Sequence, residues 1–212
     1  LARPLGFRLY LRLNLTHLLT SKNPDKWKIY KPLLKLTDSI FNIFNIIRLL
    51  FYKKSKISYF KSDRVDDEAW SFIQKYRDDN ELMRRSQEEL NWIMKNPWLE
   101  SGISENEESK RYHFSSVAKI FKFESVKILK DNKINAILII SIRDKNLKIP
   151  YCYIEPGYES DTAKFLENYM LERKLDILTV FQNSLVKTWQ KRKGPFFMKR
   201  IFRRHYIISK CF

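Results

Sequence analysis

Cysteine and histidine, the residue types that most often serve as nucleophiles and metal ligands, are few in this sequence and lie far apart. Cys152 and Cys211 show no CxxC spacing, and His17, His113 and His205 form no ligand cluster. We therefore expect two reduced thiols, as in a cytosolic protein, and neither a disulfide nor a metal site. No Ser-His-Asp or Cys-His arrangement can be argued from these spacings.

A second group of polar side chains follows a predicted strand over residues 147–154, which carries Tyr151 and Tyr153. The sequence Glu155-Pro156-Gly157 ends this strand, and Ser160 or Asp161 can cap the helix that follows. Carboxylates and phenols are groups that act in acid–base catalysis. The alternative is that both tyrosines are core or sheet-face aromatics and that Glu155 is a solvated loop residue.

The elements around this group indicate a mixed α/β (α+β) core. Residues 134–142 form a β-branched run that predicts a strand buried on both faces. Asp131-Asn132-Lys133 before it and Asp144-Lys145-Asn146 after it supply turn chemistry. Ser86 and Glu89 have the spacing of a capping box at the start of a short helix. We expect further strands at 114–123, 125–129, 175–181 and 196–210, and helices at 65–76 and 183–190.

The first residues alternate with the period of a half-buried strand, from Phe7 to Leu15. A strand needs a neighbour, and we expect that neighbour to lie upstream of Leu1. No methionine precedes Met83, so we interpret residues 1–19 as the end of a truncated preceding lobe.

Residues 20–57 are predicted to be a polar loop, 20–31, followed by an amphipathic connector helix, 33–51. Its apolar residues step by three and four from Leu33 to Leu50. A membrane span is less favoured, because Lys35, Asp38 and Arg48 interrupt the run. A helix lying on a membrane surface, with nearby lysines against lipid, stays open. The expected location is cytoplasmic, with attachment to the periphery of the inner membrane as a further option.

The basic charge lies at the two ends of the chain. Residues 1–61 carry 13 Lys and Arg against two acidic residues, and residues 177–212 carry nine with no acidic residue, within a net charge of +17. Such ends can bind nucleic acid, anionic lipid or a phosphorylated cofactor, or can simply be a solvated surface. The C-terminal basic residues alternate with Phe196, Phe197, Phe202 and Tyr206, a pattern that also suits nucleic acid.

The predicted order over residues 58–212 is helix, helix, three meandering strands, helix, strand, helix, strand. This order resembles the GCN5-related N-acetyltransferase (GNAT) superfamily. Three segments are similar to a two-lobed bacterial subset: Arg85, Leu90, Trp92 and Pro97; Ile142-Arg143-Asp144; and Pro195-Phe196-Phe197 with Arg204-His205-Tyr206. Leu5-Gly6-Phe7 resembles the close of a preceding lobe.

The resemblance implies transfer of an acyl group from acetyl-coenzyme A to an amine acceptor of unknown identity. It implies Glu155 and Tyr151 as catalytic residues, and Tyr153, Ile154, Gly157 and Ser160 as cofactor-binding residues. The family binds the coenzyme pyrophosphate through a Q/R-x-x-G-x-G/A loop, whose free backbone N–H groups face the phosphates. Here the loop has one glycine, a proline and three carboxylates. We therefore expect an accessory or acceptor-side lobe that works with a lobe preceding it; the alternative is a basic binding module without catalysis.

Overall fold

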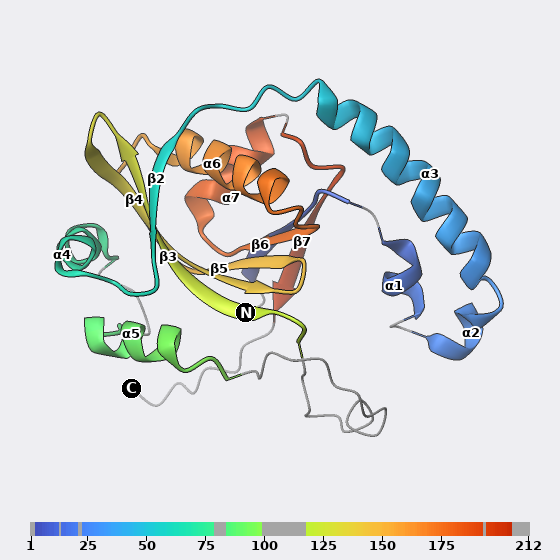
Figure 1. The fold of residues 1–212 in the computed structure, drawn as a ribbon, viewed down its shortest axis with the longest axis horizontal. Helices are drawn as coiled ribbons and strands as arrows, with labels where there is room; N and C mark the ends of the chain where they lie inside the picture. The colour runs from blue at the N-terminus through green and yellow to red at the C-terminus, as the bar shows by residue number, and fades with distance from the viewer. Residues whose placement is uncertain are drawn as a thin grey trace.

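Seven strands of the described chain form one mixed sheet with helices on both faces (Figure 1). The computed structural model describes residues 3–12, 14–20, 23–78, 84–98, 118–192 and 194–204. The sheet order is β2-β3-β4-β5-β6-β1-β7. The strands are β1 Arg3–Tyr10, β2 Ser58–Ser62, β3 Phe121–Lys130, β4 Lys133–Arg143, β5 Asn146–Ile154, β6 Ile177–Val180 and β7 Met198–Arg204. The α+β class expected from the sequence is confirmed.

Strand β4 is buried on both faces, as its β-branched sequence predicts. Ala136, Leu138 and Ile140 pack under helices α6 (Glu159–Glu172) and α7 (Asn183–Lys191). Ile137 and Ile139 pack on the other face, under α4 (Asp67–Tyr76) and α5 (Gln87–Lys95). Successive side chains of a strand point to opposite faces, so a strand covered on both sides must be apolar throughout.

Local turn and cap signals also act as predicted. Asp131 and Asn132 have positive φ angles of 52° and 60° between β3 and β4, as a tight hairpin turn requires. At the start of α5, the Ser86 hydroxyl accepts from the Glu89 N–H at 3.2 Å, and the Glu89 carboxylate accepts from the Ser86 N–H at 2.8 Å. Both hydrogen bonds of the capping box are present.

The N-terminal strand corrects one expectation. β1 pairs antiparallel with β6 on one side and with β7 on the other. Its neighbours therefore belong to this chain, and the prediction that they lie upstream of Leu1 is wrong. Residues 3–10 belong to the same sheet as residues 58–204, and a lobe before Leu1 stays a prediction.

Three further boundaries differ from the sequence prediction. Within the described residues, the strands expected at 114–123 and 125–129 form one strand, β3, which begins at Phe121 and keeps its register with β4 through Glu124; residues 114–117 lie outside the described residues. Strand β2 was not predicted; it is short and lies at the sheet edge, paired with β3. Helix α6 begins at Glu159, so Ser160 and Asp161 lie in its first turn and its N-cap is Tyr158.

The first part of the chain is more helical than predicted. β1 ends at Tyr10, and two short helices follow, α1 (Leu15–Thr20) and α2 (Pro24–Lys28). Pro24 starts α2 inside the expected loop, where its fixed φ angle suits the first helical turn. The long helix expected at 33–51 is confirmed as α3 (Lys31–Leu50), which lies along one side of the molecule beyond α1 and α2 (Figure 1). Among the described residues, no helix combines the length and apolar character needed to cross a bilayer.

Candidate functional site

The parallel pairing of β5 with β6 ends part-way along β5. β5 pairs parallel with β6 from Asn146 to Ile149, opposite Ile177 to Val180, while the other strand pairs described here are antiparallel. β6 ends at Val180, and β5 continues to Ile154 without it. The carboxyl ends of both strands thus lie at the same end of the sheet, the place where α/β proteins most often bind ligands.

A β-bulge lies in β5 at the point where its pairing with β6 ends. Ile149 and Pro150 of β5 stand opposite Ile140 alone, between the pairs Ile139–Tyr151 and Ser141–Lys148. The extra residue reverses which face of the sheet the odd-numbered side chains occupy. Leu147 and Ile149 pack under α6 and α7, whereas Tyr151 and Tyr153 pack under α4 and α5. Bulges are common next to functional sites, where they redirect side chains.

The loop from β5 into α6 binds its own carboxylate. Gly157 has a φ of 96°, and its N–H donates to the Glu159 side chain at 3.0 Å. The Tyr158 N–H donates to the Glu155 carbonyl at 3.1 Å, and Pro156 has no N–H to offer. The Gly157 and Tyr158 amides of the loop are therefore already occupied, and the Glu159 carboxylate lies where an anion would approach. These residues do not fit the pyrophosphate of a coenzyme.

Glu155 is held by two donors from other elements. The Tyr76 hydroxyl of α4 donates to it at 2.8 Å, and the Asn135 side chain of β4 donates at 3.1 Å. The hydrogen bond from Tyr76, and then that from Asn135, lower the pKa of Glu155 below its ordinary value. A general base works best with a pKa near the operating pH, so this carboxylate is a weak base as it stands. The catalytic role of Glu155 stays a prediction.

Tyr151 and Tyr153 pack on the sheet face under α4 and α5, and Glu155 bonds to Tyr76 of α4. A hydrogen bond with the Tyr151 side chain raises the pKa of the Arg85 guanidinium. Tyr153 is 5% exposed and belongs to the core under α4 and α5, while Ile154 packs on the opposite face. The structure thus brings Tyr151 close to Arg85, but it does not bring Tyr153 and Ile154 to one surface.

Arg192 at the end of α7 ties the start of α6 to its middle. One guanidinium nitrogen donates to the Ser160 carbonyl at 3.2 Å, and the other binds Glu167 at 3.0 Å. Glu167 is fully buried and also accepts from the Trp189 indole at 2.8 Å. The predicted cofactor residue Ser160 is exposed and serves Arg192 through its backbone.

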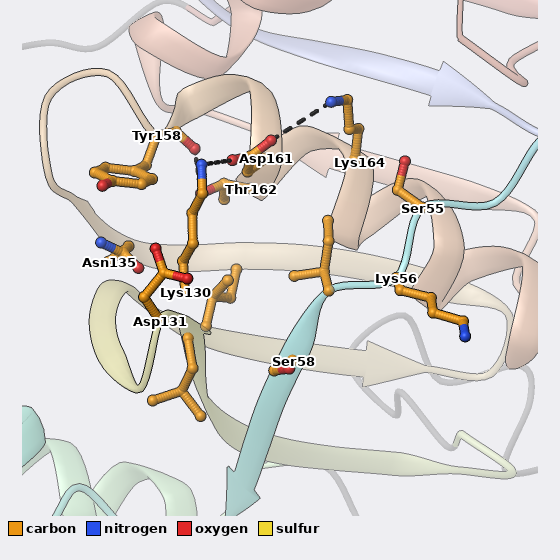
Figure 2. A pocket seen from close by; sticks show the side chains of 13 residues that line it. Ser55, Lys56, Ser58, Lys130, Asp131, Asn135, Tyr158, Asp161, Thr162 and Lys164 are labelled. Atoms are coloured by element: carbon orange, nitrogen blue, oxygen red, sulfur yellow. Dashed lines mark hydrogen bonds and ion pairs between the residues drawn. The ribbon is translucent and has the colours of Figure 1, made fainter.

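A separate pocket of about 400 Å³ lies on one side of the first turns of α6 (Figure 2). Its walls are residues 55–58, the end of β3 with the turn into β4, and the start of α6. Lys130 reaches across it to Asp161 at 3.2 Å and lies over the Tyr158 ring, and Lys164 approaches the same carboxylate at 3.5 Å. The charges of Lys130 and Lys164 are therefore paired with Asp161 within the pocket wall. None of the residues predicted for the site lines this pocket.

The C-terminal basic segment is partly used within the fold. Phe196 is 5% exposed and contacts the Trp189 ring edge-on, so it is not free to stack on a base. Lys199 donates to the backbone carbonyls of Trp189 and Arg192. Phe202 has no described side chain, and Tyr206 lies outside the described residues. Nucleic-acid binding by this segment stays a prediction, and Phe196 is no longer one of the aromatic residues that could stack on a base.

The thiols and imidazoles add no further site in the described part of the chain. Desolvation raises the pKa of the Cys152 thiol, which therefore stays protonated and unreactive at neutral pH. Cys211, His113 and His205 lie outside the described residues. Within the described ranges, no group of three or more His, Cys, Asp or Glu side chains is arranged to hold a metal ion.

Several residues that shape the site were missed from the sequence. Tyr76, Asn135 and Arg192 reach the loop from distant elements, and no local pattern indicates such contacts. Pro150 did carry a signal, because proline inside a buried strand is found chiefly at bulges. No protein-family model and no curated protein matches this sequence, so the site is interpreted from its geometry alone.

Proposed function

We propose that this chain is a GNAT-like lobe of an acyltransferase that moves an acyl group from acetyl-coenzyme A to an amine. In this proposal the lobe serves the acceptor side or the stability of the enzyme, and does not itself hold the coenzyme. The observation that carries the proposal is the end of the parallel pair, where β6 stops beside the bulge in β5 and β5 continues alone into the loop before α6. The carboxyl ends of parallel strands, followed by a helix N-terminus, are a common ligand position in α/β sheets.

The order of elements supports the same proposal. From α4 onward the chain runs helix, helix, three antiparallel strands, helix, strand, helix, strand. This is the succession on which the resemblance to the acetyltransferase superfamily rests. β1 then lies between β6 and β7 and completes the sheet.

The loop between β5 and α6 supports the accessory role in this proposal. A pyrophosphate needs free backbone N–H groups and a positive field. Here the Gly157 N–H is taken by Glu159, and Glu155 adds a second carboxylate to the same loop. A second anion at this position would meet repulsion rather than donors.

The test is isothermal titration calorimetry with acetyl-coenzyme A, performed on this chain and on any longer product of its gene. We expect no heat of binding from this chain, and binding together with acetyl transfer to an amine from the longer product. Glu159→Gln is the matched variant, because it removes the charge beside Gly157 and keeps the side-chain shape.

The outcomes test the accessory role and the acyltransferase assignment separately. Binding by the chain itself that strengthens in Glu159→Gln would mean that the loop holds phosphate, and would overturn the accessory role. Absence of binding and of transfer in both proteins would overturn the acyltransferase assignment.

A further inference from the structure

Helix α3 is attached to the molecule through its polar side chains. Asp38 is buried and accepts from the backbone N–H groups of Leu15 and Thr16 at 2.7 and 2.9 Å, which caps α1. Asn45 is also buried and donates to the Leu11 carbonyl. Arg48 donates to the Phe196 carbonyl at 3.3 Å. These hydrogen bonds, together with Leu49 on the core and an edge-on contact of Phe41 with Phe197, hold this helix against the rest of the chain.

The opposite side of α3 is apolar and uncovered in the described structure. Leu36, Ile40, Ile43 and Ile47 step by four and three along it, so they share one face of the helix. Ten large apolar side chains from Leu33 to Phe51 have exposed fractions between 42% and 84%, and one of them, Phe41, contacts the Phe197 ring edge-on. A contiguous apolar surface of this extent is rare on a monomer and marks an interaction site. These ten are Leu33, Leu36, Ile40, Phe41, Ile43, Phe44, Ile46, Ile47, Leu50 and Phe51.

The charges around this apolar face are almost all positive. Exposed lysines lie before, within and after it. Residues 23–57 contain two acidic residues, and Asp25 is the exposed one. Asp38, the other acid of this segment, is buried in its cap on α1. Trp27 and Tyr30 form an edge-on aromatic pair beside the start of the helix, with side chains suited to a boundary between water and lipid. The lysines are Lys26, Lys28, Lys31, Lys35, Lys53, Lys54 and Lys56.

We propose that the outward face of α3 docks on an anionic phospholipid bilayer, with the helix lying in the plane of the membrane surface. An apolar face that enters the acyl boundary, with lysines along its rim, is the arrangement of an interfacial helix. The polar face stays on the protein, where Asp38 and Asn45 are bonded, so docking needs no rearrangement of the fold. This proposal is independent of coenzyme binding.

A second copy of the chain fits this face less well. In a parallel pair of α3 helices, Lys31 and Lys35 would lie beside the same lysines of the other copy. In an antiparallel pair they would approach Lys53 and Lys54. The single exposed acid at Asp25 cannot offset this repulsion, whereas anionic lipid headgroups neutralise every lysine at once.

The experiment measures partition of the full chain onto vesicles by sedimentation. Vesicles of phosphatidylcholine and phosphatidylglycerol in equal parts are compared with vesicles of phosphatidylcholine alone, at low and high salt. We expect binding to the anionic vesicles that weakens with salt, and little binding to the neutral ones. Ile40→Ser/Ile43→Ser/Ile47→Ser lowers the partition coefficient at least ~100-fold, because three apolar side chains no longer enter the bilayer.

Matched variants carry the controls. Phe60→Ser/Ile120→Ser/Ile201→Ser removes three similarly exposed apolar side chains from β2, the segment before β3, and β7, and leaves partition unchanged. Lys53→Gln/Lys54→Gln lowers partition on anionic vesicles about 25-fold, at roughly fivefold per lysine. Lys75→Gln/Lys95→Gln, on α4 and α5, leaves partition unchanged. The lysine variants keep the apolar face, so they test the proposal even if the serine variant fails to fold, which circular dichroism reports.

Three outcomes would overturn the proposal. The first is that the wild-type chain does not bind anionic vesicles at low salt. The second is binding that the serine and lysine variants of α3 leave intact, or that is equally strong on neutral vesicles. The third is that the wild-type chain forms a dimer in sedimentation velocity without lipid, and that Ile40→Ser/Ile43→Ser/Ile47→Ser converts this dimer to a monomer. In this outcome neither protein binds vesicles.

Discussion

Helices α3 and α6 are both amphipathic, yet they present opposite faces to the molecule. The buried residues of α6 include Ala163, Phe165, Leu166 and Met170, which form the core over β4 and β5. The buried residues of α3 are Asp38 and Asn45, and most of its apolar side chains are exposed, although Leu49 packs on the core. Figure 1 shows α6 against the sheet and α3 at the outer side of the molecule.

The difference shows that helical periodicity reveals which side chains share a face, but not which face is covered. Burying apolar area stabilises α6 in its place. α3 is held by a few hydrogen bonds, each of which contributes about 1 kcal/mol net. Its apolar face is therefore available to a partner rather than to the core.

The largest expected effect is the contrast between Leu166→Ala and Ile43→Ala. Leu166 is fully buried, so its truncation leaves a cavity and lowers the free energy of unfolding by about 3 kcal/mol. Ile43 is 58% exposed, and its truncation changes the value by less than about 0.5 kcal/mol. Urea denaturation measures both. Equal losses at the two positions would mean that the face of α3 is covered in the free chain.

The second prediction concerns the polar attachment of α3. Asp38→Ala removes the acceptor of two α1 backbone N–H groups and of the Thr16 hydroxyl, so we expect a loss of about 2 kcal/mol in the free energy of unfolding. Ser39→Ala on the exposed side is the control and is close to neutral. Hydrogen exchange should also become faster in α1 than in α6. If Asp38→Ala were neutral as well, α3 would be held by something other than these bonds.

The smallest effect concerns a carboxylate beneath α6. Desolvation acts to raise the pKa of Glu124, but hydrogen bonds from Lys122 and Tyr169 outweigh it, and the pKa lies below the ordinary value. The stability from this charge is fully present above the unfolded pKa of about 4.3, and is lost as the pH falls through the folded pKa. Wild type should therefore exceed Glu124→Gln by about 1 kcal/mol at neutral pH.

This advantage should shrink on acidification. The measurement is the free energy of unfolding of both proteins from about pH 7 to about pH 3, across the range in which carboxylates titrate. A difference that stays constant over this range would mean that the Glu124 charge does not contribute. Asp63→Asn, at an exposed site before α4, is the matched control.

The elements that the sequence predicted well depend on local chemistry. The apolar run of β4, the capping box at Ser86 and the turn at Asp131 and Asn132 each depend on neighbouring residues, and all three were confirmed. The β2 edge strand and the neighbours of β1 were missed or misplaced, because strand pairing joins residues far apart in the sequence. For the candidate site, the sequence identified the loop after β5 and its carboxylates. It could not supply the partners of Glu155, which come from α4 and β4.

By itself, the sequence determined that this chain has an α+β core built around β4, basic ends, and a long helix with an apolar stripe between Leu33 and Leu50. Composition and period are properties of neighbouring residues, so they can be read without a structure. Only the tertiary structure decided that β1 closes the sheet beside β6, that Glu159 occupies the Gly157 amide, and that the stripe of α3 points outward. Each depends on contacts between segments whose distance and direction the fold alone establishes.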